Sequence, residues 1–203
     1  MTSSPPRYLL LDIGMVLVRL DFAPLEEKMQ ALSGLAPSRL QPLLTADGLI
    51  QKFESGAIHE REFYEDVCRR IGVRIPWPEF LEAWNSIFDR PLIPDPVLAR
   101  LSAKTHLWAV SNTNKLHFDF MSRNFSFLKY FDTLVLSHEV GALKPDARVF
   151  LHVLGRVQAK PSEILFVDDQ AANVQAARQL GIEAFQFVGP GHFIAEMQSR
   201  GLL

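Results

Sequence analysis

The sequence has a single cysteine, Cys68, among its 203 residues. An intrachain disulfide is therefore excluded, and no metal-ligand spacing surrounds this cysteine. Because chains without disulfides are typical of reducing compartments, we expect a cytoplasmic protein. Long apolar runs are also missing: none approaches the roughly 18 residues that a membrane-spanning helix needs. The first six residues lack the apolar core of a signal peptide.

An excess of charge of one sign is absent as well, since 21 Lys and Arg residues stand against 23 Asp and Glu residues. This balance argues against a surface for nonspecific nucleic-acid binding and against a basic membrane-binding face. We therefore expect a small-molecule partner, with no nucleic acid and no membrane, and a chain that is a monomer or a weak homodimer. A chain of this length buries roughly 70% of its unfolded surface, enough for one core and a small accessory domain.

Strand-like runs are few between the first strand and about Arg90, where apolar residues recur at helical spacing. The faces are Leu25, Met29 and Leu32; Phe63, Val67, Cys68 and Ile71; and Phe80, Leu81, Trp84 and Phe88. Three prolines between positions 91 and 96 mark the exit from this region. We predict a helical cap domain over residues 21–90, inserted into a core domain made of residues 1–20 and 91–203.

The rest of the chain alternates between apolar strands and helices. Strands are predicted at Tyr8–Leu11, Leu107–Val110, Thr133–Leu136, Ile164–Val167 and Ala184–Val188. Helices are predicted from Pro96 to about Ala103, from about Leu116 to Asn124, and at Ala147–Leu154 and Ala171–Leu180. This alternation, with strands that are apolar throughout, predicts a doubly wound α/β fold in which helices cover both faces of a parallel sheet.

Residues with charged or hydrogen-bonding side chains lie at or just after the ends of these strands. Asp12 ends the first strand, Ser111-Asn112 and Asp168-Asp169 end two others, and Lys144 lies in a loop after a fourth. Taken singly, each has an ordinary explanation as a turn residue, a helix cap or a solvated lysine. Parallel strands, however, bring their carboxyl ends to one edge of the sheet, where α/β proteins place their sites. Four such strand ends therefore favour a common site.

The combined chemistry of these groups suits phosphoryl transfer. Three carboxylates repel one another unless a hard cation lies between them, and such oxygen ligands suit Mg²⁺, which also accepts a phosphate oxygen. The hydroxyl of Ser111 and the backbone N–H of Asn112 can donate hydrogen bonds, and Lys144 supplies a positive charge. Positioning and electrostatic stabilisation of this kind carry most of the catalysis of phosphoryl transfer.

These motifs, in this order, resemble the four motifs of the haloacid dehalogenase (HAD) superfamily. They are Asp12-Ile13-Gly14-Met15-Val16, Ser111-Asn112-Thr113, Lys144-Pro145 and Phe166-Val167-Asp168-Asp169. The chain is most similar to the small-cap branch that includes bacterial α-D-glucose-1-phosphate phosphatases. Two further stretches carry that likeness, Ser111-Asn112-Thr113-Asn114 and Glu54-Ser55-Gly56-Ala57-Ile58.

The resemblance implies a two-step phosphatase mechanism in which Asp12 attacks phosphorus and water hydrolyses the aspartyl-phosphate. It implies that Mg²⁺ is held by Asp12, by Asp169 with help from Asp168, and by the backbone carbonyl of Gly14. It also implies that Ser111 and Asn112 hold the phosphoryl oxygens and that Lys144 shields the charge between nucleophile and phosphate.

One departure from the family concerns Gly14, where most phosphatases of the superfamily carry an aspartate that acts as acid and base. Glycine has no side chain that can transfer a proton, so general acid–base catalysis, which raises the rate roughly 10²–10⁴-fold, is missing from that position. We therefore expect a leaving group that needs little protonation, as in a hexose 1-phosphate. A replacement acid from Asp21, His117 or the cap remains open, and the resemblance places Glu54 near the site.

Other functions remain as alternatives. A 2-haloacid dehalogenase uses the same attacking aspartate on carbon without a metal, but the pair Asp168-Asp169 argues against it. A sugar phosphomutase would need the proton shuttle that Gly14 lacks. A non-catalytic module of this fold that binds a phosphorylated ligand or a protein is a third alternative. The presence of Asp12, Ser111, Lys144, Asp168 and Asp169 argues against it.

Overall fold

The computed structural model describes residues 5–203. Residues 1–4, which belong to the predicted core segment 1–20 and to the stretch considered as a signal peptide, lie outside the described residues. In the described range, no helix is both long and apolar enough to span a lipid bilayer.

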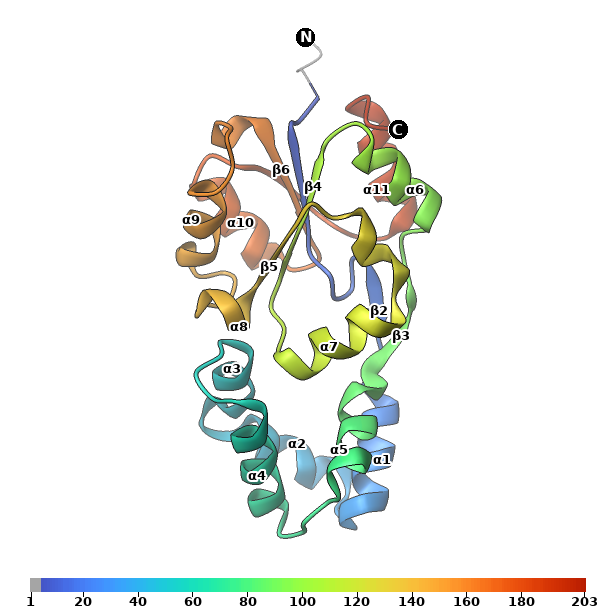
Figure 1. Cartoon of the computed structure of the whole chain (residues 1–203), viewed down its shortest axis with the longest axis vertical. Coiled ribbons are helices and arrows are strands. Elements are labelled where there is room, and N and C mark those ends of the chain that lie inside the picture. Colours follow the sequence, from blue (N-terminus) through green and yellow to red (C-terminus); the bar gives the residue numbers. More distant parts are fainter. Residues whose placement is uncertain (1–4) are drawn as a thin grey trace.

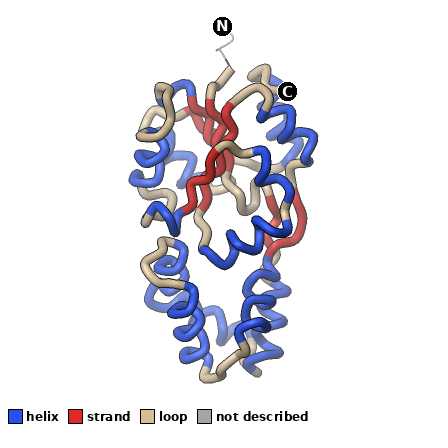
Figure 2. Tube along the Cα trace, in the orientation of Figure 1, coloured by secondary structure: helices blue, strands red, loops and turns tan. Residues whose placement is uncertain are grey.

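A five-stranded parallel sheet forms the centre of the core (Figure 2). Its strands are β1 (Tyr8–Leu11), β4 (His106–Ser111), β5 (Thr133–Leu136), β6 (Ile164–Asp168) and β7 (Glu183–Gln186), in the order β5-β4-β1-β6-β7. In register, β1 lies between β4 and β6, with Leu11 opposite Ala109 and Val167. The predicted α/β fold with a parallel sheet is confirmed.

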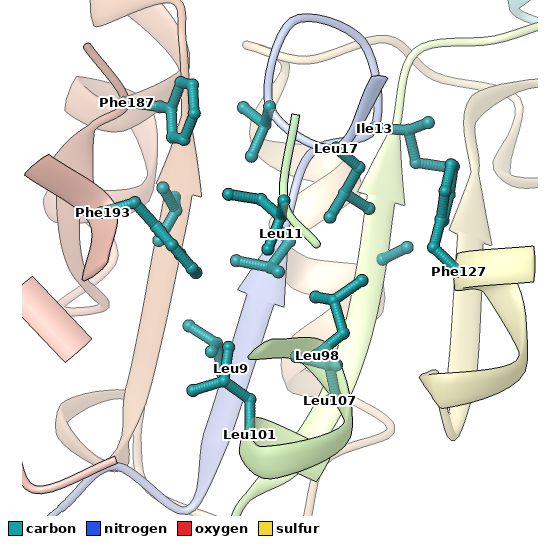
Figure 3. Packing of buried hydrophobic residues seen from close by; sticks show 14 of the residues in the cluster. Leu9, Leu11, Ile13, Leu17, Leu98, Leu101, Leu107, Phe127, Phe187 and Phe193 are labelled. Atoms are coloured by element: carbon teal, nitrogen blue, oxygen red, sulfur yellow. The ribbon is translucent and has the colours of Figure 1, made fainter. Parts of the chain in front are cut away.

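Helices cover both faces of the sheet (Figure 1). They are α6 (Asp95–Ser102), α7 (Lys115–Asn124), the 3₁₀ turn η3 (Ser126–Tyr130), α8 (Ser137–Val140), α9 (Ala147–Leu154), the 3₁₀ turn η4 (Pro161–Glu163), α10 (Ala171–Gln179) and α11 (Pro190–Ser199). Side chains alternate along β1. Leu9 and Leu11 pack with Leu98 and Phe193 on one face (Figure 3), whereas Leu10 packs on the other.

A second group of helices follows the first strand and packs around its own core. Its elements are α1 (Ala23–Ser33), α2 (Pro37–Thr45), the 3₁₀ turn η1 (Ala46–Gly48), α3 (Leu49–Glu54), α4 (Glu60–Ile71), α5 (Trp77–Trp84) and the 3₁₀ turn η2 (Asn85–Ile87). Phe53, Phe63 and Phe80 are fully buried within it, and Leu116 of α7 joins the same cluster. The predicted helical insert is confirmed, while its bounds at residues 21 and 90 stay a prediction.

Two short antiparallel strands, β2 (Val18–Leu20) and β3 (Phe88–Pro91), join the two parts. The sequence predicted no strand here, and it placed Phe88 on a helical face, which is wrong because α5 ends at Trp84. Strands of three and four residues are too short to show the alternation of apolar and polar residues that predicts a strand. Pro91 also argued against a strand at its position, because proline is rare within sheets. The short helix α8 and the final helix α11 were also not predicted.

The cap touches the core where α3 lies next to α8 (Figure 1). The hydroxyl of Ser137 donates to the backbone oxygen of Glu54 at 2.6 Å and receives the backbone N–H of Thr113 at 2.8 Å. A Cβ atom on Gly56 would lie 2.2 Å from the carbonyl oxygen of His138. Only glycine permits this approach of the cap to the carboxyl edge of the sheet.

We expect Gly56→Ala to push the cap away from the core, because the added methyl group overlaps a backbone carbonyl. A displacement of about 1 Å at a functional site can cost about 10²-fold in rate, so any activity of a site built between cap and core should fall by that order, which steady-state kinetics measures. Gly72→Ala is the matched control: φ is +74° there against +70° at Gly56, but nothing lies within 4 Å of its Cβ position. Equal losses in the two variants would show that backbone strain alone is responsible.

Candidate active site

The carboxyl edge of the sheet brings the predicted residues together. Asp12 follows β1 directly, and its backbone N–H donates to the carbonyl oxygen of Val167 on β6 at 3.0 Å. Its side chain is nearly buried, with the residue 8% exposed. Ser111 is buried at the end of β4, and Asp168 is fully buried at the end of β6.

Lys144 connects three of these strand ends. Its ammonium group lies 2.8 Å from Oδ1 of Asp12 and 2.6 Å from Oδ2 of Asp168, and it donates to the carbonyl oxygen of Val110 at 2.7 Å. Burial alone would lower the pKa of Lys144, but the attraction of Asp12 and Asp168 outweighs burial and raises it. Lys144 is therefore a fixed positive charge and not a solvated loop lysine.

Asn112 holds the loop that carries Lys144. Its side-chain oxygen accepts the backbone N–H of Lys144 at 2.8 Å, and its side-chain nitrogen donates to the backbone oxygen of Lys144 at 2.9 Å. Because the side chain is engaged in this way, the backbone N–H is the group that Asn112 can offer to an anion.

Asp168 is held from the opposite side by the start of α10. Its Oδ1 accepts the backbone N–H of Gln170 at 2.8 Å and the side-chain N–H of Asn173 at 2.9 Å. Asn173, a buried residue, was not predicted as part of the site. Its position in the first turn of the helix after the Asp168-Asp169 pair is the signal that would have indicated it.

Asp12, Asp168 and Asp169 each offer a carboxylate oxygen within 4.8 Å of the other two. Burial raises the pKa of Asp12 to about 6; the charge of Lys144 opposes this shift and that of Asp168 adds to it. Burial and then the charge of Asp168 raise the pKa of Asp169 as well. Three crowded oxygen ligands whose charges repel one another fit a hard divalent cation such as Mg²⁺. A role for the Gly14 carbonyl stays a prediction.

A cavity of about 480 Å³ lies between the carboxyl edge of the sheet and the cap. Its lining includes Ile13 and Gly14, which follow Asp12 directly in the chain, but not Asp12 itself. Gly14, Ser111 and Asn112 line it from the core, and Glu54 lines it from the cap. The cap supplies mainly apolar side chains, among them Leu25, Met29, Leu40, Leu44 and Ile50. A largely apolar pocket with a few convergent polar groups is typical of small-molecule sites.

The structure does not favour two of the candidates for a replacement acid. Asp21 is exposed and accepts the backbone N–H of Ala23 at 3.0 Å, and it does not line the cavity. His117 lines the cavity, but Asn114 donates to its Nδ1 at 3.0 Å and its Nε2 donates to the backbone oxygen of Trp84 at 3.1 Å. Burial lowers the pKa of His117 to about 4, so it stays neutral and structural.

Comparison with known proteins places this geometry in a family. The haloacid dehalogenase-like hydrolases match residues 55–181, which is more than half of the chain. The chain belongs to the haloacid dehalogenase-like hydrolase family. A D-ribitol-5-phosphate phosphatase from Bacteroides thetaiotaomicron, 30% identical over 146 residues, matches 68% of this chain and 71% of its own length.

Solved structures of haloacid dehalogenase-like proteins agree with this assignment. The HAD family enzyme bt-2542 from Bacteroides thetaiotaomicron, in complex with magnesium and inorganic phosphate, superimposes with a TM-score of 0.81 at 27% identity, over 89% of this chain and 93% of that chain. An L-2-haloacid dehalogenase from Xanthobacter autotrophicus, at 15% identity and a TM-score of 0.63 over 98% and 84% of the two chains, shares the fold. With the acidic cluster, these comparisons confirm the predicted phosphatase class and magnesium cofactor.

The loop after Asp12 contains a residue in an unfavourable backbone conformation. Met15 has φ of 58°, in the left-handed region that costs most side chains roughly 1–2 kcal/mol. Asparagine tolerates this region better, so we expect Met15→Asn to raise the free energy of unfolding by about 0.5–1 kcal/mol. Urea unfolding of the two proteins in the same buffer measures the difference, and a decrease would contradict the expectation.

Proposed function

We propose that this protein is a Mg²⁺-dependent phosphatase that hydrolyses small phosphorylated metabolites through an aspartyl-phosphate on Asp12. The observation that carries the proposal is the ammonium group of Lys144, which contacts both Asp12 and Asp168 within a cluster of three carboxylates. Gly14 and Ser111, which lie next to this cluster in the chain or at the same sheet edge, line a cavity that fits a small molecule. A buried nucleophilic carboxylate suits attack on a phosphate dianion when a fixed ammonium group and carboxylates that can bind a metal ion lie next to it.

Each predicted residue has a role in this proposal. Asp12 attacks the phosphorus, and Lys144 neutralises the charge that gathers between the two. The hydroxyl of Ser111 and the backbone N–H of Asn112 donate to the phosphoryl oxygens. Asp12, Asp168 and Asp169, with the carbonyl of Gly14, would hold Mg²⁺. The bound ion would supply positive charge against the phosphate oxygens and so lower the repulsion between phosphate and carboxylate.

The substrate class that we favour is phosphate esters of sugars and sugar alcohols. The relative from Bacteroides thetaiotaomicron is named for D-ribitol 5-phosphate, an ester of a primary alcohol. The narrower candidate is a hexose 1-phosphate. It follows from the absence of an acid at Gly14, because an anomeric oxygen leaves more readily without a proton than the oxygen of a primary alcohol does. The two candidates differ in one measurable respect, which is the ratio of the rates for the two types of ester.

Phosphate release from a panel of sugar 1-phosphates, primary sugar and sugar-alcohol phosphates and nucleotides tests the proposal. We expect release in the presence of Mg²⁺ and loss of release in EDTA, with restoration when Mg²⁺ is returned. No release from any ester, together with chloride release from a 2-chloro acid in EDTA, would instead establish a dehalogenase. Binding of phosphate without turnover would favour the non-catalytic module.

A further inference from the structure

The core motifs supply no side chain that can transfer protons in the proposed reaction. Gly14 has no side chain, His117 is buried and fully hydrogen-bonded, and Asp21 lies outside the cavity. An alkoxide leaving group and an attacking water both need proton transfer, so a group of this kind must reach the phosphate from another direction. The wall of the cavity that faces the core motifs is supplied by the cap.

Glu54 occupies that wall. It is the last residue of α3, it is partly buried, and it lines the same cavity as Gly14, Ser111 and Asn112. Unlike His117, its carboxyl group has no hydrogen-bond partner among the interactions of the described residues. It therefore faces the cavity as a free acid or base.

The fold holds Glu54 there by two contacts of its own segment with the core. The hydroxyl of Ser137 donates to the backbone oxygen of Glu54 at 2.6 Å and accepts the backbone N–H of Thr113 at 2.8 Å. Two residues later, Gly56 packs directly on the backbone of His138. The position of Glu54 is thus tied to the strand end that carries Ser111 and Asn112.

We propose that Glu54 performs the proton transfers that the family's usual aspartate would perform at position 14. This inference rests on the proposed phosphatase function. In the first step Asp12 forms a bond to phosphorus, the bond from phosphorus to the ester oxygen breaks, and the carboxylic acid of Glu54 gives its proton to that oxygen, releasing an alcohol.

In the second step a water molecule attacks the phosphorus and gives a proton to the Glu54 carboxylate. The bond between phosphorus and Asp12 then breaks, which releases inorganic phosphate and restores both side chains. The environment supports both protonation states, because burial, with a contribution from the charge of Asp12, raises the pKa of Glu54 to about 7. With this group in place, esters of primary alcohols are also substrates, which removes the reason for a strict preference for 1-phosphates.

The experiment compares two leaving groups in wild type, Glu54→Gln and a control, Glu65→Gln, which makes the same change at an exposed cap position. We expect Glu54→Gln to lower kcat/KM for ribitol 5-phosphate by about 10²–10⁴-fold, and that for 4-nitrophenyl phosphate by tenfold or less, because nitrophenolate leaves without a proton. We also expect a burst of nitrophenol, since hydrolysis of the aspartyl-phosphate still lacks its base.

A second variant separates proton transfer from a structural effect. In Glu54→Gln/Gly14→Asp an acid returns at the usual position, where the new Cβ lies 3.1 Å from Cδ1 of Leu20, the end of a flexible side chain. Recovery of ribitol 5-phosphate turnover would support the proposal. Equal losses on both esters, or no loss in Glu54→Gln, would overturn it, whereas a wild type that is inactive on every ester would refute the phosphatase function itself.

Discussion

Asp12→Asn should reduce the rate of phosphate release by about 10⁴-fold or more, because the amide that replaces the carboxylate is a poor nucleophile. The substitution keeps the size of the side chain and the hydrogen bond from the backbone of residue 12 to Val167. Steady-state kinetics on the best ester of the panel measures the loss. Asp132→Asn, an exposed aspartate just before β5, is the control and should keep the wild-type rate.

The same variant should fold at least as well as the wild type in EDTA above pH 7. The pKa of Asp12 is about 6 in the folded chain against an ordinary 3.8, so the folded state binds more protons between these values. The free energy of unfolding therefore falls as pH rises through this window. Asparagine is neutral at every pH, so the variant does not lose stability in this way as the pH rises. Thermal unfolding at pH 4 and pH 8 measures it, and a variant that is much less stable at both pH values would contradict the account.

Lys144→Met should be the most destabilising single change at the site. It removes the ammonium group that lies within 2.8 Å of Asp12 and within 2.6 Å of Asp168, and it leaves two buried carboxylates without a counter-charge. Breaking a buried ion pair on one side costs about 3–5 kcal/mol, and phosphatase activity should be lost as well. Urea unfolding in EDTA measures the effect on the free energy of unfolding.

Two comparisons isolate the cause of that loss. Lys115→Met breaks an exposed pair with Asp119, whose side chains are 49% and 35% exposed, and should cost less than about 1 kcal/mol. The double variant Lys144→Met/Asp12→Asn should recover part of the lost stability, since one buried charge is gone. A double variant as unstable as Lys144→Met would show that packing of the lysine stem, and not its charge, is what stabilises the site.

The sequence predicted the core well where a single physical signal dominates. The strands Tyr8–Leu11 and Thr133–Leu136 and the helix Ala147–Leu154 have the predicted bounds, because short apolar runs end sharply at polar residues. The strands β2 and β3 were missed, since Arg19 and Pro91 interrupt them and their pairing joins residues about 70 positions apart. The last strand was predicted at Ala184–Val188 but runs from Glu183 to Gln186, so the prediction was one residue late at its start and two residues late at its end.

The site was predictable to the extent that it depends on strand direction. Asp12, Ser111 and Asp168 lie together because parallel strands share one carboxyl edge. Lys144 reaches the same edge from the loop that comes after the strand Thr133–Leu136. Contacts between distant segments were not predictable in the same way. The side chain of Asn112 holds Lys144, 32 residues away, and Ser137 fixes the backbone of Glu54 across 83 residues. Such contacts depend on how distant loops, and the cap and the core, pack against each other, for which the sequence has no periodic signal.

The most direct test of the account is the site of covalent phosphorylation. Rapid acid quenching of the enzyme during turnover, followed by peptide mass spectrometry, should find one phosphoryl group on the peptide that contains Asp12, with Mg²⁺ present and not in EDTA. With 4-nitrophenyl phosphate, whose leaving group needs no proton, the Glu54→Gln variant should accumulate more of it, because only hydrolysis of the intermediate is slowed. A phosphoryl group on another residue, or turnover with no labelled Asp12 in either protein, would contradict the proposed function.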